Sequence, residues 1–240
     1  MALICRLILE TVQGVNPKRY FISIDEKTGI QALERIEQIA PVSKGGHTRR
    51  EFEYKRNGTT TLMAALNIAD GKIETQSLNP TRTEVDFYNF IKKVTESIVS
   101  KEPAAEIIFL TDQLNTHVSE SLVKWVAEVN HVQTDLGLKG KEGILKNKRT
   151  RQSFLESEEH TIRFLYTPKH CSWLNPIENW FAKLQRHVVE KGNFKSVEEL
   201  NCKIEKYIVF YNGYLHKAIN WKFKGFIKTE ILKNFKPSNN

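Results

Sequence analysis

The stretch EIIFLTDQLNTHVSESLVKW, residues 106–125, predicts a strand, a turn and a helix in succession. The apolar run Ile107–Leu110 has the composition of a buried strand, and apolar residues recur at helical spacing over residues 119–129. Asp112 lies between them, where the strand ends and the turn begins. Its carboxylate has two interpretations. It bonds the turn backbone, or it holds a metal ion, because ligands of open α/β sheets bind beyond the carboxyl ends of the strands.

Two further carboxylates occupy comparable places. The run Tyr20–Ile24 predicts another strand, and Asp25 ends it. Glu178 follows Asn175 and Pro176 at the predicted start of a helix. Because an N-cap residue and a Glu three positions later form a capping box, Glu178 has a structural interpretation as well. If the three carboxylates meet, they suit Mg²⁺, and two such ions roughly 3.5–4 Å apart stabilise the attacking and leaving oxygens of a phosphoryl transfer.

The remaining pattern predicts a mixed sheet flanked by helices. An antiparallel meander is expected over residues 51–78, with turns at Asn57-Gly58 and Asp70-Gly71, because these pairs favour tight hairpin turns. Thr83 is the expected N-cap of an amphipathic helix. The other expected elements are a loop over residues 38–50, a strand over 162–166, a helix over 177–188 and a last helix that begins at Ser196. This order indicates an α/β fold with parallel and antiparallel strand pairs.

The chain is basic, and its charge points to a polyanionic partner. Its 240 residues carry a net charge of +8, and the pI is about 9.3, so nucleic acid is the expected partner. Residues 131–160 have weak periodicity and are predicted to form a basic insertion on the surface, before the last strand. A phosphate track and a merely solvated loop are the two interpretations of its positive side chains. These are Lys139, Lys141, Lys146, Lys148, Arg149 and Arg151.

Several other classes of protein are excluded by motif and composition. The sequence has no apolar run of about 18 residues, which a transmembrane helix requires, and its start does not have the pattern of a signal peptide. Three widely spaced cysteines form no CxxC pair, so neither a disulfide framework nor a cysteine-rich zinc site is expected. The common glycine-rich nucleotide-binding motifs are absent from the sequence too.

Three longer motifs resemble a known family. They are SIDEKTGIQALER at residues 23–35, TDQLNTH at 111–117 and YTPKHCSWLNPIENWF at 166–181. In this order they resemble the catalytic domain of bacterial insertion-sequence transposases of the mariner superfamily, over residues from about 20 to 224. Gln113 stands where the family often has Asn, and the spacing from Asp112 to Glu178 is longer than in the compact members. The basic segment 131–160 accounts for this excess.

The resemblance implies a fold, a reaction and partners. It implies an RNase H-like domain with a five-stranded mixed sheet over residues 18–235, after a linker remnant or lead-in at 1–17 and before a tail at 236–240. It places an Asp-Asp-Glu triad on Asp25, Asp112 and Glu178, which would bind two Mg²⁺ or Mn²⁺ ions per site. The implied activity is cleavage and strand transfer of double-stranded DNA at element ends and target, by a homodimer in the DNA complex. The implied location is the bacterial cytoplasm, in association with the nucleoid.

Two other functions remain open at this level. Such transposases usually carry helix-turn-helix domains before the first catalytic strand, and only 19 residues precede Tyr20. A decayed or partial copy would bind DNA and regulate transposition without catalysis. A nuclease of the same fold without strand transfer is the other alternative.

Four ring side chains near the triad are also candidates for DNA contacts. His117 and His170 lie close in sequence to Asp112 and Glu178, where a role in positioning DNA competes with a structural role in the turn. Trp173 and Trp180 could stack on a flipped or terminal base, whereas packing in the core is the expected role of at least one of them.

Overall fold

The computed structural model describes residues 1–35 and 53–223. The predicted loop over residues 38–50, the expected domain end at 235 and the tail at 236–240 lie outside the described residues. None of the helices in the described part of the chain is long and apolar enough to cross a membrane.

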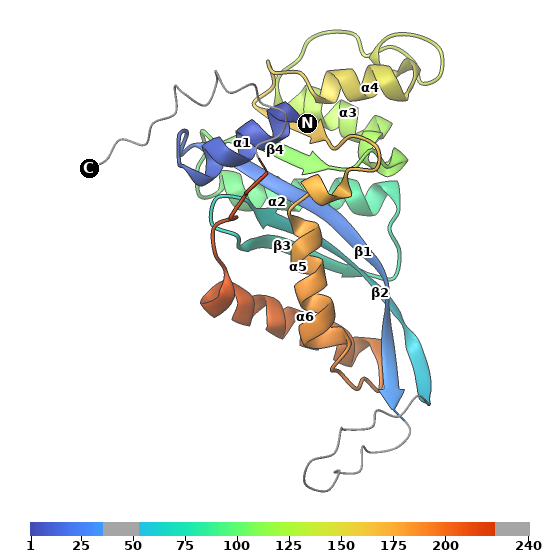
Figure 1. Cartoon of the computed structure of the whole chain (residues 1–240). Coiled ribbons are helices and arrows are strands. Elements are labelled where there is room, and N and C mark those ends of the chain that lie inside the picture. The colour runs from blue at the N-terminus through green and yellow to red at the C-terminus, as the bar shows by residue number, and fades with distance from the viewer. Residues whose placement is uncertain (36–52, 224–240) are drawn as a thin grey trace, which may run out of the picture.

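A five-stranded mixed sheet forms the centre of the molecule (Figure 1). The strands follow the order β3-β2-β1-β4-β5 across the sheet. The pairs β1–β2 and β2–β3 are antiparallel, whereas β1–β4 and β4–β5 are parallel. The strands are β1 (Arg19–Arg35), β2 (Tyr54–Asn67), β3 (Ile73–Asn79), β4 (Glu106–Thr111) and β5 (Ile162–Tyr166). The predicted RNase H-like architecture is therefore confirmed.

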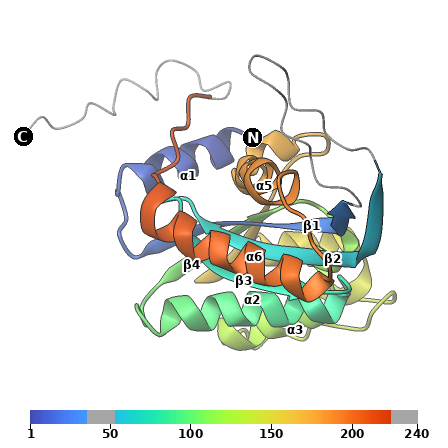
Figure 2. The same cartoon turned by 90° about the horizontal axis from the view of Figure 1, so that it is seen from below.

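Helices cover both faces of this sheet, as Figure 2 shows. Helices α2 (Glu84–Val99) and α3 (Glu120–Val129) pack on one face, and α4 (Lys148–Leu155) packs beside α3. Helices α1 (Ala2–Val12), α5 (Ile177–Leu184) and α6 (Val197–Phe210) cover the other face. Short 3-10 turns are η1 (Asn115–Val118), η2 (Ile144–Lys146) and η3 (Ser172–Leu174), and π-helical turns are η4 (Gln185–Val189) and η5 (Tyr211–Leu215).

The register of the central strands brings two candidate carboxylates to the same edge. Ser23 of β1 lies beside Leu110 of β4 in a parallel pair. Asp25 and Asp112 each follow two residues later, so both lie where β4 ends. Because strand residues alternate between faces, Asp25 points toward the α5 face and its neighbour Glu26 toward the α2 face.

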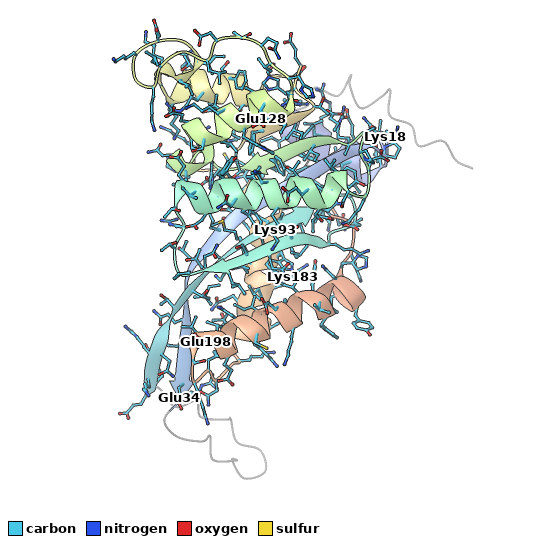
Figure 3. All side chains as sticks on the ribbon, turned by 180° about the vertical axis from the view of Figure 1, so that it is seen from behind. Lys18, Glu34, Lys93, Glu128, Lys183 and Glu198 are labelled. Carbon is cyan, nitrogen blue, oxygen red and sulfur yellow. The ribbon has the colours of Figure 1, made fainter. Side chains whose placement is uncertain are left out.

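One predicted turn is wrong, and the other is confirmed. Asn57 and Gly58 lie inside β2, where the two of them oppose the single residue Ala32 of β1. They form a bulge in which Gly58 adopts a φ of 111°, so the pair that favours a tight turn here lets a long strand bend. The β1–β2 arm continues past it, and Figure 3 shows Glu34 near its far end. At Asp70-Gly71 the chain does turn between β2 and β3, with Gly71 at a φ of 75°.

The N-terminal residues are part of the core, which corrects the expected linker remnant or lead-in at 1–17. Helix α1 buries Ile4, Cys5, Leu7 and Ile8 against the sheet. Its partners include Phe21 of β1 and strand residues of β4 and β5. The short apolar run that resembled a lead-in is one face of an amphipathic helix.

The segment 131–160 is only partly a surface insertion. It lies between α3 and β5, as predicted, but it folds into η2 and α4. Leu145 and Leu155 are buried in the same core as α2 and α3. Asn147 caps α4 by a capping box with Thr150, which anchors the start of this helix. The segment is therefore a packed part of the domain, and its outer surface is basic.

Candidate active site

The three candidate carboxylates come from the edge where β1, β4 and α5 meet. Asp25 lies within β1, Asp112 follows β4, and Glu178 is in the first turn of α5, which lies over β1 and β2 in Figure 1. Burial raises the pKa of Asp25 to about 7, and the negative charges of Asp112 and Glu178 add to this rise. The three groups therefore share one electrostatic environment. Within residues 1–35 and 53–223, no three His, Cys, Asp or Glu side chains are close enough together to hold a metal ion.

Asn175 connects the start of α5 to β1 and does not cap the helix. Its Nδ2 donates to the carbonyl oxygen of Ile24 at 2.9 Å and to Oδ2 of Asp25 at 3.2 Å. Its Oδ1 accepts a short hydrogen bond from Ser23, whose Oγ in turn accepts from the backbone N–H of Ile177 at 3.0 Å. These bonds place the first turn of α5 directly over Asp25.

The capping interpretation of Glu178 is therefore wrong. The N-cap of α5 is Pro176, and no side chain among the described residues caps this helix start. Glu178 is exposed, and its carboxylate raises the pKa of Asp25. The side chain of Asn175 forms three hydrogen bonds with residues of β1, whereas capping the helix would give it one or two.

Asp112 does form the turn that its position suggested. Its Oδ1 accepts from the backbone N–H of Leu114 at 2.9 Å and lies 2.7 Å from Nδ1 of His117. Burial acts to raise the pKa of Asp112, but the hydrogen bond and the charge of His117 lower it on balance. The side chain remains 45% exposed, so the turn role leaves part of the carboxylate open to a ligand.

His117 is fully buried, which corrects the expectation that it contacts DNA. Nε2 of His117 lies 3.0 Å from Oε1 of Glu26, a buried carboxylate with a side chain that is 4% exposed. Burial acts to lower the pKa of His117, but its bonds to Asp112 and Glu26 raise it to about 9. The 3-10 turn η1 folds the ring inward beneath the sheet edge, so no DNA can reach it.

The basic residues of segment 131–160 have three different environments. Lys148 donates to the carbonyl oxygen of Gln113 at 2.5 Å and to Oδ1 of Asn115 at 3.0 Å, beside Asp112. Arg151 donates to the carbonyl oxygens of Val118 and Leu145 and so joins η1, η2 and α4. Lys139 forms an ion pair with Glu120 at 3.5 Å. Three side chains are exposed to solvent and form no such bond within the described part of the chain: Lys141, Lys146 and Arg149.

One of the two candidate tryptophans is buried and the other is exposed, as expected. Trp180 is buried and packs on Phe181 and Tyr211, so core packing is confirmed for it. Trp173 is 50% exposed and, with Glu178, lines a cavity of about 690 Å³. Three lysines also line this cavity: Lys183, Lys217 and Lys222. His170 is exposed on the loop before it, at a φ of 60°.

Sequence reasoning missed Glu26 and the role of Asn175. Glu26 directly follows Asp25, but its side chain faces the opposite side of the sheet. No sequence motif near Glu26 predicts its contact with His117. Strand alternation after Asp25 was the only available signal. The bond from Asn175 to β1 spans about 150 positions, which a local motif does not show.

The comparisons with known proteins agree with this fold. Residues 20–201 match the family described as DDE superfamily endonuclease. Among solved structures, the chain is similar to the Mos1 transposase paired-end complex with left transposon end, with 14% identity and a TM-score of 0.56 over 86% of this chain and 53% of that chain. A Mos1 mariner paired end complex with Mn gives 14% identity and a TM-score of 0.55, over 87% of this chain and 53% of that chain.

A third solved structure has a more similar length. The catalytic domain of Mos1 mariner transposase gives 12% identity and a TM-score of 0.51, over 87% of this chain and 78% of that chain. This chain spans about half the length of the chains in the two complexes. No curated protein matches it. Because the family match covers most of the sequence and includes all three candidate carboxylates, the chain belongs to the DDE superfamily endonuclease family.

Proposed function

We propose that the chain is the catalytic domain of a transposase that cleaves DNA phosphodiesters and transfers strands. It would hydrolyse the phosphodiester at the end of the element and present the freed 3′-OH to target DNA. One observation carries the proposal: Asp25 lies within β1 beside the end of β4, where burial raises its pKa to about 7 and the negative charges of Asp112 and Glu178 add to this rise. Asp112 and Glu178 repel the negative charge of ionised Asp25. A divalent cation bound among these carboxylates would relieve that repulsion.

The donor set of this site fits Mg²⁺ or Mn²⁺. Asp25, Asp112 and Glu178 are hard oxygen donors, and we propose that they hold two ions. The bound ions would supply Lewis acidity for the attacking and leaving oxygens. Asn175 and Leu114 orient Asp25 and Asp112 through the bonds described above. The similar Mos1 complex with Mn supports the use of a divalent metal.

The basic surface beside the carboxylates would hold the DNA. Exposed positive side chains on segment 131–160 would contact phosphates, which give affinity without reading bases. Trp173 and His170 are exposed and lie close in sequence to Glu178. The similar Mos1 paired-end complex contains the left transposon end, which supports DNA as the partner. We also propose a homodimer in the DNA complex and a bacterial, nucleoid-associated location in the cytoplasm.

The test is an incubation of the full chain with Mn²⁺ and labelled double-stranded DNA. Nicked products and joined products are expected, and Asp25→Asn should abolish both. Lys191→Ala, an exposed change away from the carboxylates, is the control that should cleave like wild type. Cleavage without joining would identify a nuclease instead of a strand transferase. If wild type and Asp25→Asn give the same products, the proposed site is wrong.

A non-catalytic DNA-binding regulator is the second candidate. The observation in its favour is that, in the described residues, the carboxylates do not form a ready metal site. DNA binding that is insensitive to Mn²⁺, without any cleavage, would select it.

A further inference from the structure

We infer that Glu26 and His117 are a positioning pair that holds Asp112 in place for the metal site. This inference rests on the proposed function, because it assumes that Asp112 is a metal ligand. Neither residue touches the reacting atoms in this scheme. Both act through Asp112, from the opposite face of the sheet to Asn175.

Strand alternation sets up the pair. Asp25 and Glu26 are neighbours in β1, so their side chains point to opposite faces. Asp25 receives its hydrogen bond from Asn175 above the sheet, whereas Oε1 of Glu26 lies 3.0 Å from Nε2 of His117 below it. Nδ1 of His117 then lies 2.7 Å from Oδ1 of Asp112. The imidazole therefore links the strand that carries Asp25 to the turn that carries Asp112.

The ring is held too firmly for an incidental contact. Its side chain is fully buried, and its centroid lies 4.1 Å from that of Phe87. Nδ1 also lies 3.1 Å from Oγ1 of Thr111 and 3.3 Å from the carbonyl oxygen of Asp112. Its two nitrogens therefore have separate carboxylate partners, Glu26 at Nε2 and Asp112 at Nδ1. The ring thus bridges the two carboxylates, with one nitrogen facing each of them.

This bridge leaves Asp112 one oxygen for a ligand. Oδ1 receives the donors from His117 and from the backbone of Leu114. The side chain is 45% exposed, and Oδ2 is the oxygen that remains for a cation. Partners of this kind orient ligating groups, and their loss typically weakens metal binding by about 10–100-fold.

The experiment measures binding of Mn²⁺ to the full chain without DNA, by titration calorimetry. Glu26→Gln keeps the size of the side chain and an oxygen that accepts from His117. It removes the charge that completes the bridge. His117→Phe keeps a ring against Phe87 and removes both bonds. Each variant should weaken Mn²⁺ binding by about tenfold or more. The double variant should be no weaker than the weaker single one, because residues that act as a unit are not additive.

A matched core variant separates positioning from general loss of stability. Val126→Ala removes buried apolar volume from α3 without touching Asp112 or His117, so it should lower the thermal midpoint and leave Mn²⁺ affinity unchanged. If His117→Phe does not fold, Glu26→Gln decides alone. Folded Glu26→Gln with wild-type Mn²⁺ affinity overturns the inference.

Asp25→Asn in the same titration separates this inference from the proposed function. If wild type binds Mn²⁺ and Asp25→Asn does not, the metal site stands, and Glu26→Gln tests the pair on its own. If wild type binds no Mn²⁺, the proposed metal site fails, and the positioning pair fails with it.

Discussion

Replacing Asp25 with Asn should stabilise the metal-free protein at pH 8. The pKa of Asp25 is raised from 3.8 to about 7, so the folded state disfavours its ionised form. The unfolded chain releases this proton near pH 4, and the folded chain releases it near pH 7. Stability is therefore lost as the pH rises through this window, and the whole cost is present above pH 7. Asn carries no charge and avoids the cost.

The size of the gain follows from the shift. One pKa unit corresponds to about 1.36 kcal/mol, which gives an upper limit of about 4 kcal/mol. Asp25 is partly exposed, and Asn loses one of the two acceptors that serve Glu26 N–H and Asn175, so about 1–2 kcal/mol should remain. For a domain of this size, that gain raises the thermal midpoint by about 2–8 °C.

The assay compares thermal midpoints of wild type and Asp25→Asn at pH 5 and pH 8, with and without Mn²⁺. The advantage of the variant should be larger at pH 8 than at pH 5. Mn²⁺ at 100 times its dissociation constant should stabilise wild type by about 2.7 kcal/mol, and the variant much less. Equal midpoints at both pH values, with equal stabilisation by Mn²⁺, would refute the account of Asp25.

Four further sets of variants test the other assignments. Asp112→Asn should reduce the stability at pH 8 by on the order of 1 kcal/mol and so lower the midpoint, because the pKa of Asp112 is lowered and its charge-assisted bond with His117 becomes a weaker one to a neutral amide; a higher midpoint would contradict this. Arg151→Ala should also lower the midpoint, since two backbone carbonyls lose their donor. By contrast, a triple alanine variant of the exposed cations should keep its midpoint. It should reduce the slope of log K for DNA binding against log salt concentration by up to about 3, because each phosphate contact contributes about 0.9. An unchanged slope would show that these side chains do not contact DNA. The three cations are Lys141, Lys146 and Arg149. Trp180→Ala should cost about 3–5 kcal/mol of stability, whereas Trp173→Ala should leave the midpoint unchanged and weaken binding of single-stranded DNA by about 1–3 kcal/mol.

The sequence alone determined the elements whose cause is local. Apolar runs and helical spacing correctly predicted β4, β5 and α3, and Thr83 does cap α2 through a capping box with Asp86. The placement of Asp112 directly after β4 also followed from sequence, because a strand is recognised by its own composition. The expectation that Asp25 ends its strand was wrong, because β1 continues to Arg35 by pairing with β2. The same local reasoning identified the turn bond of Asp112.

Tertiary structure decided every feature that depends on a distant partner. Asn57-Gly58 became a bulge because β1 is long enough to pair with both sides of it. Residues 1–17 became core because the sheet offers α1 an apolar face that the sequence does not show. Asn175 bonds β1 instead of capping α5, and His117 turns inward to Glu26 instead of outward to DNA. In each case a side chain or segment that could adopt several local conformations adopts the one that gives a buried group its partner. Leaving a buried polar group without a hydrogen bond, or an apolar face in water, costs more free energy than a local turn or cap preference contributes.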